Sequence, residues 1–265
     1  MIGMTVVLVS AFDPKQTLAT KRVRDTIACG GAALPTRMIA SIAGSLALVA
    51  CASSALVEQP TAANLHSSHP PTACQPANGR QGQTGCWVIA TADIGAPATA
   101  PYWHVYEFAS AEQARPHANA PAKVINAFGR TWLVAVATRE WSVQGGRHLA
   151  TVGPLNLLST APHMATFMEA TFTPGMLSRI HTHPGPEAWV VLEGEQCLET
   201  SESVIRARAG DAMMVRGGIP MALFGTGTGV RRALVLILHP ASEPLGTPHD
   251  RWKPTGACLG QPSAD

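Results

Sequence analysis

The stretch of sequence that decides the fold is GMLSRIHTHPGPEAWVVLEG, residues 175–194. Two histidines, His181 and His183, stand at positions i and i+2, and Glu187 follows four positions after the second. On a β-strand, residues i and i+2 point to the same face. Both imidazoles are therefore expected to face one interior point, and the Pro-Gly-Pro turn at 184–186 lets Glu187 on the next strand face the same point.

Two imidazole nitrogens and one carboxylate oxygen form a facial set of ligands for one divalent metal ion, which could be Fe, Mn, Zn, Ni or Cu. Such a set leaves coordination positions open for water or substrate. The alternative interpretation is a pair of solvent-exposed loop histidines.

The spacing resembles the first motif of the cupin superfamily: a glycine, five residues, His-x-His, three or four residues, a glutamate, six residues and a glycine. The fixed positions are filled by Gly175, His181, His183, Glu187 and Gly194. The resemblance implies an all-β protein with a cupin double-stranded β-helix, a jelly-roll barrel that holds the metal inside its mouth.

The second cupin motif is matched only in part. Its two glycines correspond to Gly210 and Gly218, but its proline is replaced by Arg216 and its histidine, the family's fourth ligand, by Met221. A thioether is a soft and weak ligand, so Met221 either coordinates a soft ion such as copper or packs beside a three-ligand site. His163 or His239 could instead complete the shell from another strand.

The same period-two alternation predicts two neighbours of the metal. Arg179 shares the face of the two histidines, and Trp189 shares the face of Glu187, so both are predicted to line a substrate cavity. An arginine beside a metal suits a small-molecule ligand that carries a carboxylate, and the indole would form a wall. The alternative for Arg179 is a solvated position near the mouth.

The region before the motif also predicts strands. Strand-like runs cover residues 87–90, 103–108, 131–137 and 148–152. The likeness of RTWLVAVA to EAWVVLEG suggests a bicupin, in which residues 84–158 form a degenerate first barrel and residues 159–245 the metal-binding barrel. The alternative is that the earlier strands extend the second barrel. Residues 246–265 are interpreted as a C-terminal tail.

The N-terminus resembles an export signal. Residues 1–51 are interpreted as an extension and signal peptide that ends in a bacterial lipobox, with Cys51 as the lipidated residue. An ordinary secretory signal is the alternative. Residues 52–83 are rich in Ala, Ser, Pro and Gln and predict a disordered linker. The expected location is the periplasm or the outer membrane of a bacterium, with membrane contact only through the lipid anchor.

The remaining cysteines fit an exported protein. Cys74 and Cys86 are close enough in sequence to form a disulfide. Cys197 and Cys258 are a second candidate pair, although Cys197 on a predicted strand could equally be a buried apolar residue.

Composition limits the classes of function. The chain has 265 residues, of which 46% are apolar and 14% charged, and its net charge of +2 includes no basic run in its latter two thirds that could follow a nucleic acid. We expect an exported metal-dependent enzyme, an oxygenase such as a dioxygenase, an isomerase or a lyase, that acts on a small carboxylate or oxygen-rich ligand. The alternative is a non-catalytic binding protein of the envelope. Barrels of this type often pair through edge strands, which makes a homodimer an expectation.

Overall fold

The computed structural model describes residues 9–10, 74–79 and 84–259, and most of these lie in β-strands. The strands are β1 (Val9–Ser10), β2 (Gln75–Pro76), β3 (Gly85–Gly95), β4 (Tyr102–Phe108), β5 (Ala122–Ala127), β6 (Arg130–Ala137), β7 (Arg147–Val152), β8 (His163–Phe172), β9 (His181–Thr182), β10 (Glu187–Glu193), β11 (Glu195–Thr200), β12 (Val204–Arg208), β13 (Asp211–Val215), β14 (Met221–Thr226), β15 (Arg231–Pro240) and β16 (Thr247–Pro248). Within the described residues the helices are short: α1 (Ala111–Ala114) and the 3-10 turns η2 (Ala77–Gly79) and η3 (Arg115–His117). The all-β prediction is confirmed.

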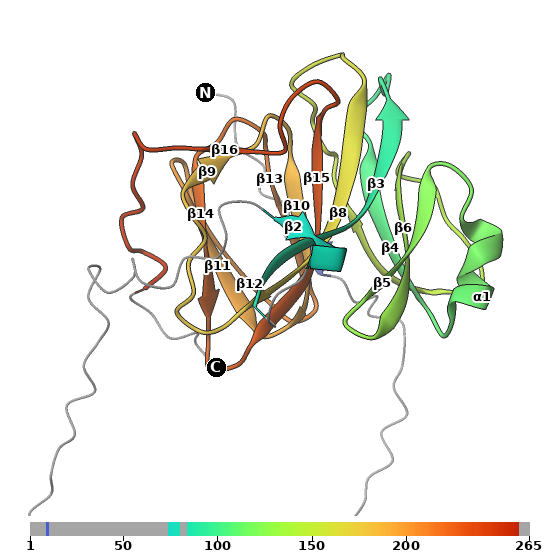
Figure 1. Cartoon of the computed structure of the whole chain (residues 1–265), viewed down its shortest axis with the longest axis horizontal. Coiled ribbons are helices and arrows are strands. Elements are labelled where there is room, and N and C mark those ends of the chain that lie inside the picture. Colours follow the sequence, from blue (N-terminus) through green and yellow to red (C-terminus); the bar gives the residue numbers. More distant parts are fainter. Residues whose placement is uncertain (1–8, 11–73, 80–83, 260–265) are drawn as a thin grey trace, which may run out of the picture. The chain divides into compact units, whose positions relative to one another are not determined.

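The strands β8 to β15 pass back and forth between two sheets (Figure 1). One sheet has the order β1-β13-β10-β15-β8-β3-β2, and the other has the order β12-β11-β14-β9-β16. Apolar side chains from both sheets meet in one core that includes Met168, Trp189, Leu198, Leu223 and Val235. Two facing sheets between which the chain passes repeatedly form a double-stranded β-helix, so the predicted cupin-type barrel is confirmed.

A third sheet, with the order β5-β6-β4-β7, packs against the outer face of the larger barrel sheet. Trp103 and Trp132 of this sheet share a buried cluster with Ala188 and Val190 of β10. The neighbouring positions of β10, such as Trp189, face the barrel interior instead. Both faces of β10 are therefore covered, which explains why its sequence is almost continuously apolar rather than alternating.

The four strands predicted before the motif are confirmed as parts of β3, β4, β6 and β7. Strand β5 and helix α1 were not predicted from the sequence. Strand β3 pairs antiparallel with β8 and so extends the barrel sheet, whereas β4 to β7 form the separate sheet. A degenerate first barrel stays a prediction.

The N-terminal predictions fall mostly outside the described residues. Of residues 1–51, the predicted extension and signal peptide, only β1 is described, and it pairs antiparallel with β13. The lipidation site Cys51 and residues 52–73 and 80–83 of the predicted linker lie outside the described residues. The part of the linker that is described contains β2, which pairs in parallel with β3, and the neighbouring Cys74 forms a disulfide with Cys86. No helix in the described part of the chain has the length and apolar character needed to cross a bilayer.

The segment interpreted as a tail packs on the barrel over residues 246–259. Strand β16 pairs antiparallel with β9, and Cys258 forms a disulfide with Cys197 of β11. Cys258 is also almost fully buried. The barrel therefore continues beyond residue 245, because the chain after β15 returns to cover β9.

The turn that joins β9 to β10 has no room for a side chain at Gly185. A Cβ atom at this position would lie 2.0 Å from the carbonyl oxygen of Leu238 in β15. Hydrogen bonds hold the turn on both sides, from Leu238 N to Pro186 O (3.0 Å) and from Gly218 N to His183 O (2.8 Å). Glycine at this position thus allows the turn to rest directly on two neighbouring backbone segments.

We expect Gly185→Ala to lower the free energy of unfolding by about 1–3 kcal/mol, because the methyl group overlaps a backbone atom that cannot rotate away. Chemical denaturation of the purified protein measures this change. Gly229→Ala is the matched control, since a Cβ atom there meets nothing within 4 Å. Equal stability of the two variants would contradict the close packing described for the turn.

Candidate metal centre

The three predicted metal ligands meet between the two barrel sheets. His181 lies on β9 of the smaller sheet, Glu187 begins β10 of the larger sheet, and His183 lies in the connection between them. One ligand atom from each side chain lies within 4.8 Å of the others. His183 and Glu187 are only 6% and 7% exposed, so the cluster is not a set of surface histidines.

Both imidazoles are held in one tautomer by backbone carbonyls. His181 Nδ1 lies 2.6 Å from the carbonyl oxygen of Arg179, and His183 Nδ1 lies 2.6 Å from that of Leu245. A carbonyl only accepts hydrogen bonds, so each Nδ1 must carry the proton and donate it. The lone pair of each neutral ring is then on Nε2. Metal-ligating histidines commonly donate their other ring N–H to a carbonyl in this way.

Two buried atoms of the cluster have no hydrogen-bond partner among the described residues. His183 Nε2 and Glu187 Oε2 lie 3.0 Å apart, which is the distance of an ion pair, but their geometry is not that of a hydrogen bond. A neutral His183 would place its lone pair against a carboxylate oxygen. Unsatisfied buried polar atoms cost about 1–3 kcal/mol each. A cation between them would satisfy both, so these residues fit a divalent metal ion.

The electrostatic effects on the two histidines differ. Burial lowers the pKa of His181, and the neighbouring His183 acts in the same direction. Burial is the largest single effect on the pKa of His183 and acts to lower it, but the carboxylate of Glu187 and the carbonyl of Leu245 together outweigh burial, and the net pKa of His183 is raised. The lowered pKa of His181 thus favours its neutral form, whereas the raised pKa of His183 favours its protonated form beside the carboxylate of Glu187.

The cluster opens into a cavity of about 310 Å³. Apart from the ligands, its walls are mostly apolar. They include Ala170, Phe172, Trp189, Met221, Leu223, Val235 and Ile237 from the barrel strands, the disulfide-bonded Cys74 and Cys86, and Pro244, Leu245, Gly246, Thr247 and Pro248 from the segment after β15. A cavity of this size and character admits a small organic molecule rather than a polymer.

The residues considered as a fourth ligand occupy different places. Met221 pairs with His181 across β14 and β9, is 1% exposed and lines the cavity. His163 and His239 lie at the same end of the β8–β15 pairing, where His163 pairs with Pro240 and His239 with Met164, and neither lines the cavity. His163 Nδ1 instead contacts the carbonyl oxygen of Ala161 at 2.6 Å. Of the three, only Met221 is placed beside the cluster.

The two residues predicted to bind substrate both line the cavity, but they differ in exposure. Trp189 is 1% exposed and forms part of the inner wall, as its position on the face of Glu187 predicts. Arg179 is exposed, and its carbonyl oxygen accepts the hydrogen bond from His181. Its guanidinium is therefore available at the solvent side of the cavity.

Sequence reasoning missed Arg231, whose guanidinium is fully buried. Its Nε donates to Gln196 Oε1 at 2.5 Å, and its guanidinium carbon lies 5.3 Å from the ring centroid of Phe172. Burial lowers the pKa of Arg231 to about 9, and the charge of Glu187 opposes this shift, so the group is charged at neutral pH. Alternation along β15 could have revealed it, because Arg231 shares a face with the inward residues Val235 and Ile237.

Sequence reasoning also missed the contribution of residues 244–248. These residues follow the last strand of the motif region and carry no chemical signature. They reach the site only because β16 pairs with β9.

Comparisons with known proteins give structural neighbours only. No protein-family model matches the chain, and no curated protein matches it. The solved structures that are similar include a conserved protein with a double-stranded β-helix domain from Klebsiella pneumoniae (19% identity, 33% of this chain and 76% of that chain, TM-score 0.29). A cupin superfamily protein from Desulfitobacterium hafniense has 19% identity over 32% of this chain and 73% of that chain, with a TM-score of 0.27.

A third neighbour is described as a putative sugar phosphate isomerase from Acidithiobacillus ferrooxidans, with 21% identity over 27% of this chain and 48% of that chain and a TM-score of 0.25. The isomerase activity belongs to the description of that neighbour and is not assigned to this chain. What the strand order of this chain itself establishes is a double-stranded β-helix barrel of the cupin type.

Proposed function

We propose that this protein binds one divalent metal ion on His181, His183 and Glu187 and acts as a metal-dependent enzyme on a small carboxylate or oxygen-rich ligand. The observation that carries the proposal is the pair of buried atoms His183 Nε2 and Glu187 Oε2, which lie 3.0 Å apart without a hydrogen bond, beside a cavity of about 310 Å³. Both rings already present Nε2 toward the cluster, since their Nδ1 atoms are committed to carbonyls. The site needs no change of tautomer to bind a cation.

The cavity supports a small ligand with an anionic end. Arg179 would hold a carboxylate at the solvent side, where a guanidinium can form two parallel hydrogen bonds. Trp189 and the aliphatic residues would enclose the remainder and exclude water. A bound divalent metal ion supplies Lewis-acid polarisation of a substrate oxygen.

The acidic and basic side chains that line the cavity limit which mechanisms of an oxygenase, an isomerase or a lyase the site could support. Among the described residues that line the cavity, Glu187 is the only carboxylate, and the proposal commits it to the metal. A mechanism that needs a separate carboxylate base inside the cavity therefore finds no side chain for it in that part of the chain. Reactions in which the substrate itself supplies or receives the proton fit the cavity best.

Export from the cytoplasm remains part of the proposal. The two disulfides, Cys74–Cys86 and Cys197–Cys258, support it, because such bonds persist in oxidising compartments such as the periplasm.

A non-catalytic metal-binding protein is the second candidate function. It is favoured by Met221, whose buried thioether lines the cavity beside His181 and could select a soft ion such as copper.

For the metal site, we expect the purified protein to contain about one iron, manganese, nickel or zinc ion per chain, and His181→Ala/His183→Ala to contain less than about a tenth of that, because only one ligand remains. Elemental analysis by mass spectrometry measures both. His148→Ala is the control, since His148 is exposed and lies on β7, away from the cavity. Absence of metal from all three proteins after incubation with each ion would refute the metal site.

For Met221, we expect Met221→Leu to keep the same metal at the same stoichiometry, because a side chain that only packs can be replaced by one of similar volume. Elemental analysis combined with Cu(I) competition titration distinguishes the two functions. Copper in the native protein that is lost from Met221→Leu would instead establish the copper-binding alternative.

For the carboxylate subsite, we expect Arg179→Gln to weaken binding of oxalate to the Co²⁺-loaded protein about 10- to 100-fold, because one charge-assisted hydrogen-bonding partner is lost. Isothermal titration calorimetry measures this. Arg251→Gln removes another exposed arginine that does not line the cavity and should bind oxalate as the native protein does. Equal affinity of the Arg179 variant would remove Arg179 from the proposed site.

A further inference from the structure

The segment from Glu243 to Cys258, here called the C-terminal clamp, runs along the cavity and returns to the barrel wall. It begins with a turn in which Glu243 N donates to Pro240 O at 3.0 Å. Its strand β16 then lies antiparallel to β9, the strand that carries His181. Two further bonds fix this pairing, between Thr182 Oγ1 and Thr247 Oγ1 (3.0 Å) and from His249 N to Ile180 O (3.0 Å).

The clamp contacts the metal ligand His183 directly. The carbonyl oxygen of Leu245 accepts the Nδ1 proton of His183 at 2.6 Å and so fixes both the tautomer and the ring orientation. Leu245 itself packs against the apolar core of the barrel. The acceptor is therefore part of a packed structure rather than a free loop.

Gly246 is the point at which the clamp lies against the imidazole. A Cβ atom at Gly246 would lie 2.8 Å from His183 Nδ1, 2.9 Å from its Cε1 and 3.1 Å from Thr182 O. The ring is buried and cannot swing away without breaking its bond to Leu245. Glycine at this position lets the backbone follow the edge of the ring.

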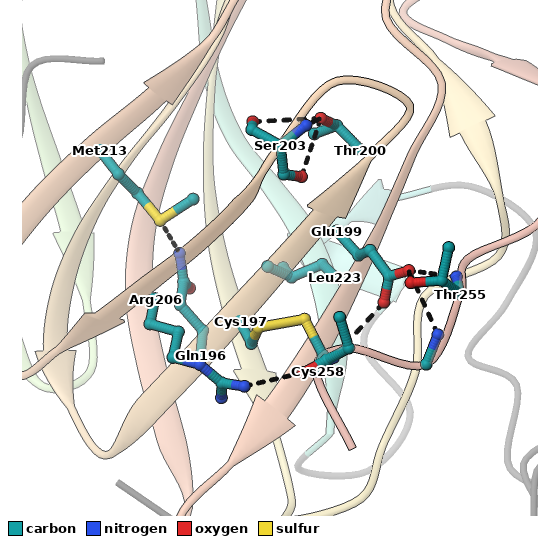
Figure 2. The surroundings of a disulfide bond; sticks show 12 residues. Gln196, Cys197, Glu199, Thr200, Ser203, Arg206, Met213, Leu223, Thr255 and Cys258 are labelled. Carbon is teal, nitrogen blue, oxygen red and sulfur yellow. Dashed lines mark hydrogen bonds between the residues drawn. A yellow bond between two sulfur atoms is a disulfide. The ribbon is translucent and has the colours of Figure 1, made fainter. Parts of the chain in front are cut away.

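The far end of the clamp is anchored to β11. Figure 2 shows Glu199 pointing toward Thr255, beside the Cys197–Cys258 disulfide. The buried carboxylate of Glu199 accepts hydrogen bonds from Thr255 N, from Thr255 Oγ1 (2.8 Å), from Gly256 N (3.2 Å) and from Cys258 N (3.4 Å). Arg206 Nη2 adds a bond to Ala257 O at 2.8 Å.

Both a disulfide and hydrogen bonds to the Glu199 carboxylate hold the far end of the clamp on β11. The disulfide and the hydrogen bonds that the Glu199 carboxylate accepts from several backbone N–H groups fix residues 255–258. The other end of the clamp is continuous with β15. With both ends fixed, the stretch between them is held against β9, and its carbonyl at Leu245 has a defined position.

We propose that the C-terminal clamp positions His183 for metal binding, with Leu245 and Gly246 as its contacts and with Glu199 and the Cys197–Cys258 disulfide as its anchor. This inference rests on the proposed metal-binding function. It assigns a positioning role to residues that touch the metal ligand but do not themselves bind the metal, and it makes the affinity of the site depend on a disulfide on the barrel wall.

The test uses Gly246→Ala in the full chain, with Gly229→Ala as the matched control. The dissociation constant for Co²⁺ is measured by competition with a chelating indicator. We expect the Gly246 variant to bind about 10- to 100-fold more weakly, as is typical when an outer partner of a metal-ligating histidine is disturbed. We also expect its visible Co²⁺ absorption bands to shift, because the ligand geometry changes, whereas Gly229→Ala should match the native protein. The same affinity and spectrum in both variants would overturn the inference.

The anchor is tested separately with Cys197→Ala/Cys258→Ala, which leaves every residue of the cavity in place. We expect weaker Co²⁺ binding with an unchanged far-ultraviolet circular dichroism spectrum. This variant also decides the question if Gly246→Ala fails to fold, since native affinity without the disulfide would contradict the anchoring role.

A readout without metal separates this inference from the proposed function. Nitrogen-15 spectra of the metal-free protein report which ring nitrogen of His183 carries the proton. We expect a single Nδ1-protonated form in the native protein and a changed signal in Gly246→Ala. Absence of Co²⁺ binding by the native protein would refute the proposed function alone. An unchanged His183 signal in metal-free Gly246→Ala would refute the positioning role of the clamp, whether or not the native protein binds metal.

Discussion

The close contact between the Pro184–Pro186 turn and the backbone of β15 is the constraint on which the site depends. The turn crosses from the smaller barrel sheet to the larger one, and it carries His183 on one side and Glu187 on the other. Because a Cβ atom at Gly185 would lie 2.0 Å from Leu238 O, the turn lies directly against the backbone of the larger sheet. The imidazole and the carboxylate are thereby fixed 3.0 Å apart, a separation that one cation can bridge.

The sheet of β4 to β7 covers the outer face of the larger barrel sheet and so restrains β10, the strand that follows the turn. Strand β10 is buried on both sides, by the barrel interior and by the sheet of β4 to β7. A strand packed on both faces has little freedom to shift, since interiors are close to crystal density. The additional sheet thus holds Glu187 in place without contributing a side chain to the cavity. This is a structural role for a region that carries no metal ligands.

The interior of the barrel also tolerates charges that are costly to bury. Glu187 and Arg231 are both buried, and the charge of Glu187 acts against the lowering of the Arg231 pKa, although no ion pair joins them. Arg231 is held by Gln196 and by the ring of Phe172, and Glu187 lies beside His183. A buried imidazole nitrogen and a buried carboxylate oxygen that make no hydrogen bond, such as His183 Nε2 and Glu187 Oε2, persist more readily where a ligand completes their interactions. The fold alone does not specify which ligand binds there.

The sequence by itself determined the barrel and the three-ligand cluster. The spacing of His181, His183 and Glu187 can be read locally, because alternation along a strand fixes which side chains share a face. The strands rich in β-branched and aromatic residues were predictable for the same reason. Only the tertiary structure decided what surrounds the cluster. The acceptor at Leu245 and the glycine contact at Gly246 depend on contacts between segments far apart in the chain, and backbone carbonyls leave no trace in residue identity.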